Sequence, residues 1–97
     1  MTTAAVPTMM IHTSGPITSA ERAYAQRKIA DAQRFASAPV RCTKVELRAE
    51  TNPSWERPAL AKATVDVNGL IVRAHADATT MFAAIDALEA RLRRRLK

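Results

Sequence analysis

Two alternating segments joined by Asn68-Gly69 constrain the fold of this chain more than any other feature. Every second residue is apolar in "ALAKATVDV" (residues 59–67) and in "LIVRAHA" (residues 70–76), which is typical of strands with one buried face. Asn-Gly is a strong hairpin signal because both central residues of a tight two-residue turn need a positive φ angle. The sequence therefore predicts an antiparallel hairpin. The residues expected to face the core are Ala61, Ala63, Val65, Val67, Leu70, Val72, Ala74 and Ala76.

Two further strands precede this hairpin. "TMMIHTS" (residues 8–14) is a short apolar run that fits an opening strand, and "TKVELRAE" (residues 43–50) alternates like the hairpin strands. "TNPSWERP" (residues 51–58) contains two prolines and predicts the loop before the hairpin. In the second of these strands the residues expected to face the core are Thr43, Val45, Leu47 and Ala49.

The segment 20–36 predicts an amphipathic helix, because its apolar residues recur at helical spacing. Thr18 or Ser19 is expected to be the N-cap, with Glu21 placed to complete a capping box. Pro39 opposes any continuation of the helix. The apolar side is expected to consist of Tyr24, Ala25, Ile29, Ala32, Phe35 and Ala36.

The last segment, "MFAAIDALEARLRRRLK" (residues 81–97), has apolar residues spaced 4, 3, 4 and 4 apart. This spacing predicts a second helix with a core-facing stripe, capped by Asp77 or Thr79. The stripe consists of Met81, Ile85, Leu88, Leu92 and Leu96.

The order of elements is strand, helix, three strands, helix. Each strand has one apolar face and each helix one apolar stripe, so both helices are expected to cover the same face of a four-stranded sheet. The predicted fold is a two-layer α+β domain of β-α-β-β-β-α order, similar to double-stranded-RNA-binding domains. Residues 1–7 are expected to form a flexible lead, and residues 8–97 a single domain.

Composition excludes several classes of function. No apolar run is long enough to span a bilayer, and the N-terminus lacks the pattern of a secretion signal, which favours a cytoplasmic protein. The single cysteine, Cys42, is expected to be a buried thiol in a reducing compartment. His12 and His75 have no metal-ligand spacing, and Gly15 and Gly69 are the only glycines, so no phosphate loop exists. We therefore expect no enzyme, no metal and no cofactor.

The balance of charge points to a polyanionic partner. Fifteen Lys and Arg residues against nine Asp and Glu residues give a net charge of +6, which is high for so small a domain. The helix dipole favours one or two positive side chains in a last turn, but five in seven residues repel one another. A nucleic acid would relieve that repulsion and release counterions. A membrane surface and a merely solvated helix end are the alternatives.

The basic residues are expected to gather on the helical layer. On the last helix, Arg93, Arg94 and Lys97 project opposite the apolar stripe, whereas Arg91 and Arg95 flank it. The first helix carries outward basic residues, and the stem of one lysine lies along its apolar side. The strands carry no aromatic residue for base stacking, so recognition of phosphate and shape is expected. The candidate RNA-binding residues are Arg22, Arg27, Lys28, Arg34, Arg91, Arg93, Arg94, Arg95 and Lys97.

The stretch "VNGLIVRAHADATTMFAAIDALEARLRRRLK" resembles the end of the ribosome hibernation-promoting factor family, also called ribosome-associated inhibitor or sigma-54 modulation proteins. The family pattern Met-Tyr-Ala-Ala-Ile-Asp is matched here by "MFAAID" (residues 81–86). "ITSAERAYAQRKIADAQRF" (residues 17–35) resembles the first helix of the family. Together the resemblance covers residues 8–97. The chain departs from the pattern at Thr79 and Thr80, where an acidic pair is usual, and at Phe82 and Asp31.

The resemblance implies the same β-α-β-β-β-α fold and a non-enzymatic factor that silences translation. It further implies binding to rRNA of the small ribosomal subunit, in the channel used by tRNA and mRNA. Arg22, Lys28, Arg91, Arg94 and Arg95 carry over by position, whereas the other four candidates rest on charge alone. Longer members carry a second domain that pairs ribosomes, so the chain can be a short member or a segment of a longer one, and a homodimer stays open.

Two other functions compete with this interpretation. A general double-stranded-RNA-binding module would share the fold and the basic surface. A protein-interaction regulator fits the basic surface less well, because binding to a protein partner would not require so high a positive charge.

Overall fold

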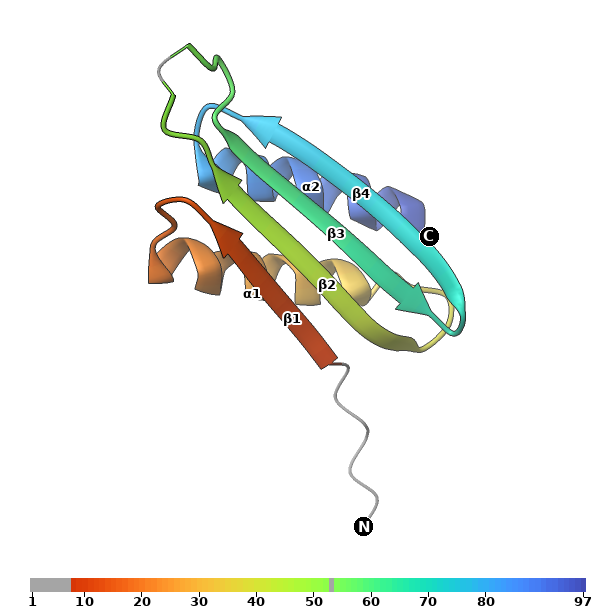
Figure 1. Cartoon of the computed structure of the whole chain (residues 1–97). Coiled ribbons are helices and arrows are strands. Elements are labelled where there is room, and N and C mark those ends of the chain that lie inside the picture. The colour runs from red at the N-terminus through yellow and green to blue at the C-terminus, as the bar shows by residue number, and fades with distance from the viewer. Residues whose placement is uncertain (1–7, 53) are drawn as a thin grey trace.

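The computed structural model describes residues 8–52 and 54–97, so the lead predicted for residues 1–7 lies outside the described part of the chain. A four-stranded sheet carries two helices on one face, as Figure 1 shows. The predicted α+β class, element order and two-layer arrangement are confirmed. The elements are β1 (Thr8–Ser14), α1 (Ser19–Gln33), β2 (Val40–Ala49), β3 (Ala59–Val67), β4 (Leu70–Ala78) and α2 (Met81–Leu96).

The strands lie in the order β1-β2-β3-β4. β1 pairs with β2 in parallel, whereas β2 with β3 and β3 with β4 pair antiparallel. A parallel pair needs a crossover connection, and α1 supplies it between β1 and β2. β1 and β4 are therefore the two edge strands, and the sheet face opposite the helices is not covered by any described element (Figure 1).

The core lies between the sheet and the helices. All five residues of the α2 stripe are buried, as are Thr43, Val45 and Leu47 of β2. The hydroxyl of buried Thr43 accepts a hydrogen bond from the side chain of Gln33 at the end of α1, so this polar group is satisfied. The alternation predicted for β3 is also confirmed, since Ala61, Ala63, Val65 and Val67 are buried.

Two residues expected in the core are exposed. Leu70 is the first residue of β4, directly after the hairpin turn, and 69% of its surface is exposed. Phe35 is 43% exposed because α1 ends at Gln33, so the ring lies past the last helical turn. Periodicity extrapolated beyond a helix end does not place a side chain.

The turns and caps mostly follow their sequence signals. Asn68 and Gly69 have φ angles of 52° and 96°, as the predicted hairpin requires. Thr18 caps α1, and its hydroxyl and the Glu21 side chain form the reciprocal bonds of a capping box. Gly15 has a φ of 83°, and a Cβ there would lie 2.1 Å from the backbone oxygen of Ala49, so only glycine fits.

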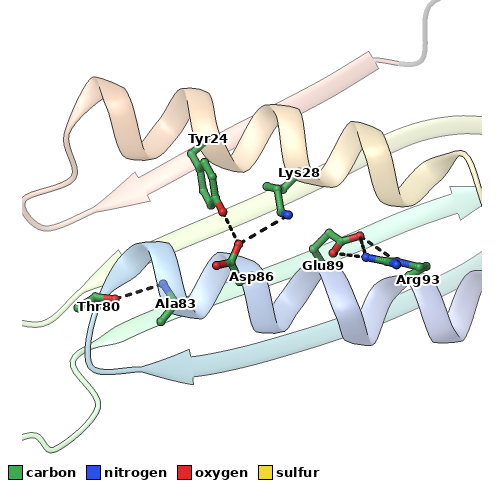
Figure 2. Close-up of polar contacts among 7 residues, drawn as sticks. All are labelled: Tyr24, Lys28, Thr80, Ala83, Asp86, Glu89 and Arg93. Carbon is green, nitrogen blue, oxygen red and sulfur yellow. Dashed lines mark hydrogen bonds and ion pairs between the residues drawn. The ribbon is translucent and has the colours of Figure 1, made fainter.

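The cap predicted for α2 is wrong by one residue. Thr80 is the N-cap, and its hydroxyl accepts a hydrogen bond from the backbone of Ala83 at 3.2 Å (Figure 2). Asp77 cannot serve, because β4 remains paired with β3 as far as Ala78. Thr79 follows this strand directly and lies one position too early.

The buried thiol predicted at Cys42 is also wrong, since Cys42 is exposed. β2 begins at Val40, and the side chain of Thr43 faces the core. Successive side chains of a strand point to opposite faces, so Cys42 lies on the sheet face that the helices leave open.

Candidate nucleic-acid interface

The helices α1 and α2 run side by side in the same direction over the sheet (Figure 1). Tyr24 near the start of α1 packs edge-on against Phe82 at the start of α2, with ring centroids 5.1 Å apart. Farther along, the guanidinium of Arg93 lies 5.2 Å from the ring centre of Phe35. The first contact joins the starts of the two helices, and the second joins their C-terminal ends. The helices therefore meet along one continuous seam, which is bordered by side chains from both.

The first half of the seam is joined by polar contacts around Asp86. The hydroxyl of Tyr24 donates a hydrogen bond to Asp86 Oδ1, and Lys28 Nζ lies 3.8 Å from the same oxygen (Figure 2). The hydrogen bond to Asp86, followed by partial burial, raises the pKa of Tyr24 above 10.0. The charge of Lys28 is therefore partly balanced within the fold, and its pairing ties α1 to α2.

The second half of the seam contains a buried carboxylate. Glu89 is only 4% exposed, and Arg93 one turn later binds it at two points, with Nη2 2.6 Å from Oε1 and Nε 3.0 Å from Oε2 (Figure 2). The hydrogen bonds to Glu89, and then its charge, raise the pKa of Arg93. Arg93 was predicted to lie opposite the stripe; it is half-buried, and its guanidinium lies near the ring of Phe35.

The other side of α2 faces the edge strand β4. There Arg91, Arg94 and Arg95 line a hollow of about 400 Å³ together with Ala74 and His75. Arg91 Nη1 donates a hydrogen bond of 2.6 Å to the backbone oxygen of His75. Within the described residues, Arg94 and Arg95 form no ion pair and both are exposed. Three guanidinium groups around one hollow suit a phosphate group, because each presents donors in a fixed fork.

The basic residues of α1 are spread along that helix. Arg22 Nη2 lies 3.4 Å from the backbone oxygen of Ile11 in β1, the other edge strand. Arg27 lies over the ring of Tyr24 at 5.4 Å. Arg34 is the C-cap and is exposed. Arg22 and Arg91 therefore each touch a carbonyl on an open sheet edge, a contact that hinders edge-to-edge pairing.

The nine candidate residues thus fall into two groups. Arg22, Lys28, Arg91 and Arg93 are engaged in hydrogen bonds or ion pairs within the fold. The side chains with no such bond in the described part of the chain are Arg27, Arg34, Arg94, Arg95 and Lys97. The structure brings Arg91, Arg94 and Arg95 together beside β4, and places Arg93 and Lys97 on the α1 side.

Sequence reasoning missed the roles of Phe35 and Glu89. Glu89 follows Leu88 directly, so it adjoins the apolar stripe of α2. Lys97 Nζ lies 5.6 Å from the centre of the Phe35 ring, so two cations of α2 approach one aromatic residue. The spacing of Arg93 and Lys97, four residues apart, was the available signal.

Other kinds of site find no support in the described residues. Residues 8–52 and 54–97 contain no group of three or more His, Cys, Asp or Glu side chains that could hold a metal ion. Neither described helix combines the length and the apolar character needed to cross a membrane.

The sequence and the fold are both similar to known proteins. Residues 12–97 match the family model described as Sigma 54 modulation protein / S30EA ribosomal protein. The structure is similar to the N-terminal domain of Protein Y from Thermus thermophilus, with 27% identity, a TM-score of 0.73 and coverage of 93% of this chain and 96% of that chain. A ribosomal subunit interface protein from Coxiella burnetii shares the fold at 16% identity, with a TM-score of 0.69 and coverage of 91% of each chain. Comparison with curated protein sequences found no match.

Proposed function

Because the chain belongs to the Sigma 54 modulation protein / S30EA ribosomal protein family, we propose that it is a cytoplasmic translation-silencing factor. The members of this family are ribosome-associated factors and are not known as enzymes. In this proposal the protein binds rRNA of the small ribosomal subunit in the channel used by tRNA and mRNA. Occupation of that channel blocks decoding without any chemical step.

The observation that carries the proposal is the basic helical layer. Arg94 and Arg95 project from α2 beside β4, and Arg34 ends α1, all three exposed and without an ion pair in the described part of the chain. Exposed, unpaired guanidinium groups lose little on meeting a phosphate and gain two parallel hydrogen bonds. The net charge of +6 adds long-range attraction to a polyanion.

Among the candidates, we assign the direct phosphate contacts first to the residues without an internal bond. Lys28 and Arg93 are assigned a secondary role in phosphate binding, because each already pairs with a carboxylate of α2. Arg22 and Arg91 keep donors beyond the one that each uses on a strand carbonyl. The residues assigned direct contact are Arg27, Arg34, Arg94, Arg95 and Lys97.

The burial of α2 argues against a membrane surface as the partner. A helix that lies in a membrane interface needs an apolar face free of protein contacts. The whole stripe of α2, from Met81 to Leu96, is buried in the core instead. The basic side chains are therefore left for a hydrophilic partner.

Co-sedimentation with purified small subunits over a series of salt concentrations tests the proposal. We expect binding at low salt that weakens steeply as salt rises, because released counterions drive it. Absence of binding at low salt would refute the proposal. Competition with a plain RNA duplex distinguishes this function from the alternative. A general double-stranded-RNA-binding module would be displaced from the subunit by the duplex, whereas a factor shaped for the decoding channel would stay bound.

A further inference from the structure

Phe35 is exposed at a position where the fold gathers positive charge. The residue follows the C-cap of α1, and its backbone N–H donates to the oxygen of Ala32 at 3.1 Å, which holds the chain in place. The residue is 43% exposed, so part of it is open to solvent.

Two cations of α2 lie near this ring. The Arg93 guanidinium lies 5.2 Å and Lys97 Nζ 5.6 Å from the ring centre, both within the range of cation–π attraction. Arg93 cannot swing away freely, because buried Glu89 holds its guanidinium at two points. The neighbouring residue Arg34 adds a third, exposed charge.

An exposed aromatic ring beside several cations matches one class of ligand well. Unpaired RNA bases stack on phenylalanine and arginine side chains, while the flanking phosphates need positive charge. A paired duplex offers no free base face, and a peptide of acidic residues alone offers charge but no flat ring. The chemistry of the site therefore favours a single unpaired nucleotide over both.

We propose that Phe35 is a stacking platform for an unpaired RNA base, whose flanking phosphates are held by Lys97 and Arg34. The inference rests on the proposed rRNA binding and deepens it, because it adds a base contact to an interface otherwise expected to recognise phosphate and shape. Arg93 is a positioning residue, because its guanidinium, which is held by Glu89, orients the Phe35 ring.

The test compares two ligands of equal charge, a short oligouridine and a chain of abasic ribose phosphates of the same length, by fluorescence anisotropy at low salt. The wild-type protein is expected to bind the oligouridine roughly tenfold more tightly, as one stacked base would give. Phe35→Leu should abolish this preference, because it weakens binding of the oligouridine much more than binding of the abasic chain. Phe35→Trp should retain the preference.

Phe82→Leu is the matched control, because Phe82 is also 43% exposed but packs against Tyr24 at the opposite end of the seam. It should keep the preference for bases. Circular dichroism melting of each variant separates a lost contact from a lost fold. Equal wild-type affinity for both ligands, or a preference retained in a folded Phe35→Leu protein, overturns the inference.

Three further outcomes distinguish between the stacking site, the ribosomal function and an acidic protein partner. If an oligoglutamate peptide displaces oligouridine and Phe35→Leu weakens the peptide equally, the partner is an acidic protein surface and the inference fails. If Phe35→Leu loses the base preference but the protein does not sediment with small subunits, the stacking site stands and the proposed ribosomal function fails. If the protein sediments normally without any base preference, only the stacking site fails.

Discussion

Arg93 and Glu89 form a two-point ion pair across one turn of α2, with Arg93 Nη2 2.6 Å from Glu89 Oε1. The partners are unequal, because the side chain of Glu89 is 6% exposed and that of Arg93 is 41% exposed. One guanidinium thus neutralises a buried carboxylate and still reaches the ring of Phe35. In a helix end crowded with arginines, this one is needed by the fold itself.

This asymmetry predicts unequal effects of the two single substitutions on stability. Arg93→Met leaves the buried carboxylate of Glu89 without its partner, so this substitution should be the more destabilising of the two. Glu89→Gln leaves an arginine that water can solvate, so its cost should be smaller. Urea denaturation of both variants measures the free energy of unfolding. An equal or reversed order would mean that the pair does not hold Glu89 in the way described.

The contact between Tyr24 and Asp86 predicts a dependence of stability on pH. The folded-state pKa of Tyr24 is raised, first by its hydrogen bond to Asp86, so the neutral phenol is favoured by folding. The contribution is fully present below the unfolded pKa of about 10 and is lost as pH rises through the folded pKa. Tyr24 is the only tyrosine, so ultraviolet titration of the phenolate follows it directly.

Asp86→Ala supplies the matched variant for this titration. Removal of the carboxylate should lower the pKa of Tyr24 towards the ordinary value of tyrosine. The alkaline loss of stability due to Tyr24 should then be smaller than in the wild-type protein, because the folded and unfolded pKa values of Tyr24 come closer together. A titration curve that does not move in Asp86→Ala would show that Asp86 is not the cause.

The hollow beside β4 predicts a specific change in salt dependence. Arg94→Gln combined with Arg95→Gln should weaken small-subunit binding and reduce the slope of log affinity against log salt by about 1.5 to 2, as the loss of two phosphate contacts does. Arg91 is kept, because it also bonds the oxygen of His75. Lys62→Gln with Arg73→Gln, two exposed positions on the strands, removes the same charge from the open sheet face and should alter the slope much less. Equal slopes in the two double variants would remove the hollow from the interface.

The hydrogen bond from Arg91 to the backbone oxygen of His75 predicts that Arg91 helps to prevent self-association. The outer edge of β4 has no strand partner among the described elements, and its residues Leu70 and Ile71 are exposed. Such an edge is a template for pairing with a second chain. Arg91→Ala should therefore raise the tendency to dimerise at high concentration, whereas Arg91→Lys should suppress it in part. Sedimentation velocity over a concentration series measures the difference, and an unchanged mass in Arg91→Ala would contradict the prediction.

Much of the fold could be read from periodicity. The alternation of β2 and β3, the Asn68-Gly69 turn and the α2 stripe were all predicted and are confirmed. The resemblance in "MFAAID" is likewise confirmed by the family model over residues 12–97. The errors at the Thr80 cap and at Phe35 lie at element ends, where the local pattern runs out and pairing with β3 or the last helical turn decides.

The sequence by itself determined which residues of α2 face the core, because a 100° rotation per residue places each side chain relative to the axis of its own helix. Only the tertiary structure decided what lies on the two remaining sides. With α1 on one side and the β4 edge on the other, Arg93 and Lys97 were drawn to Phe35, and Arg91, Arg94 and Arg95 to the hollow by His75. Those neighbours come from distant parts of the chain. The packing of the helices on the sheet therefore decides which charged side chains form bonds within the described fold, and periodicity does not encode that packing.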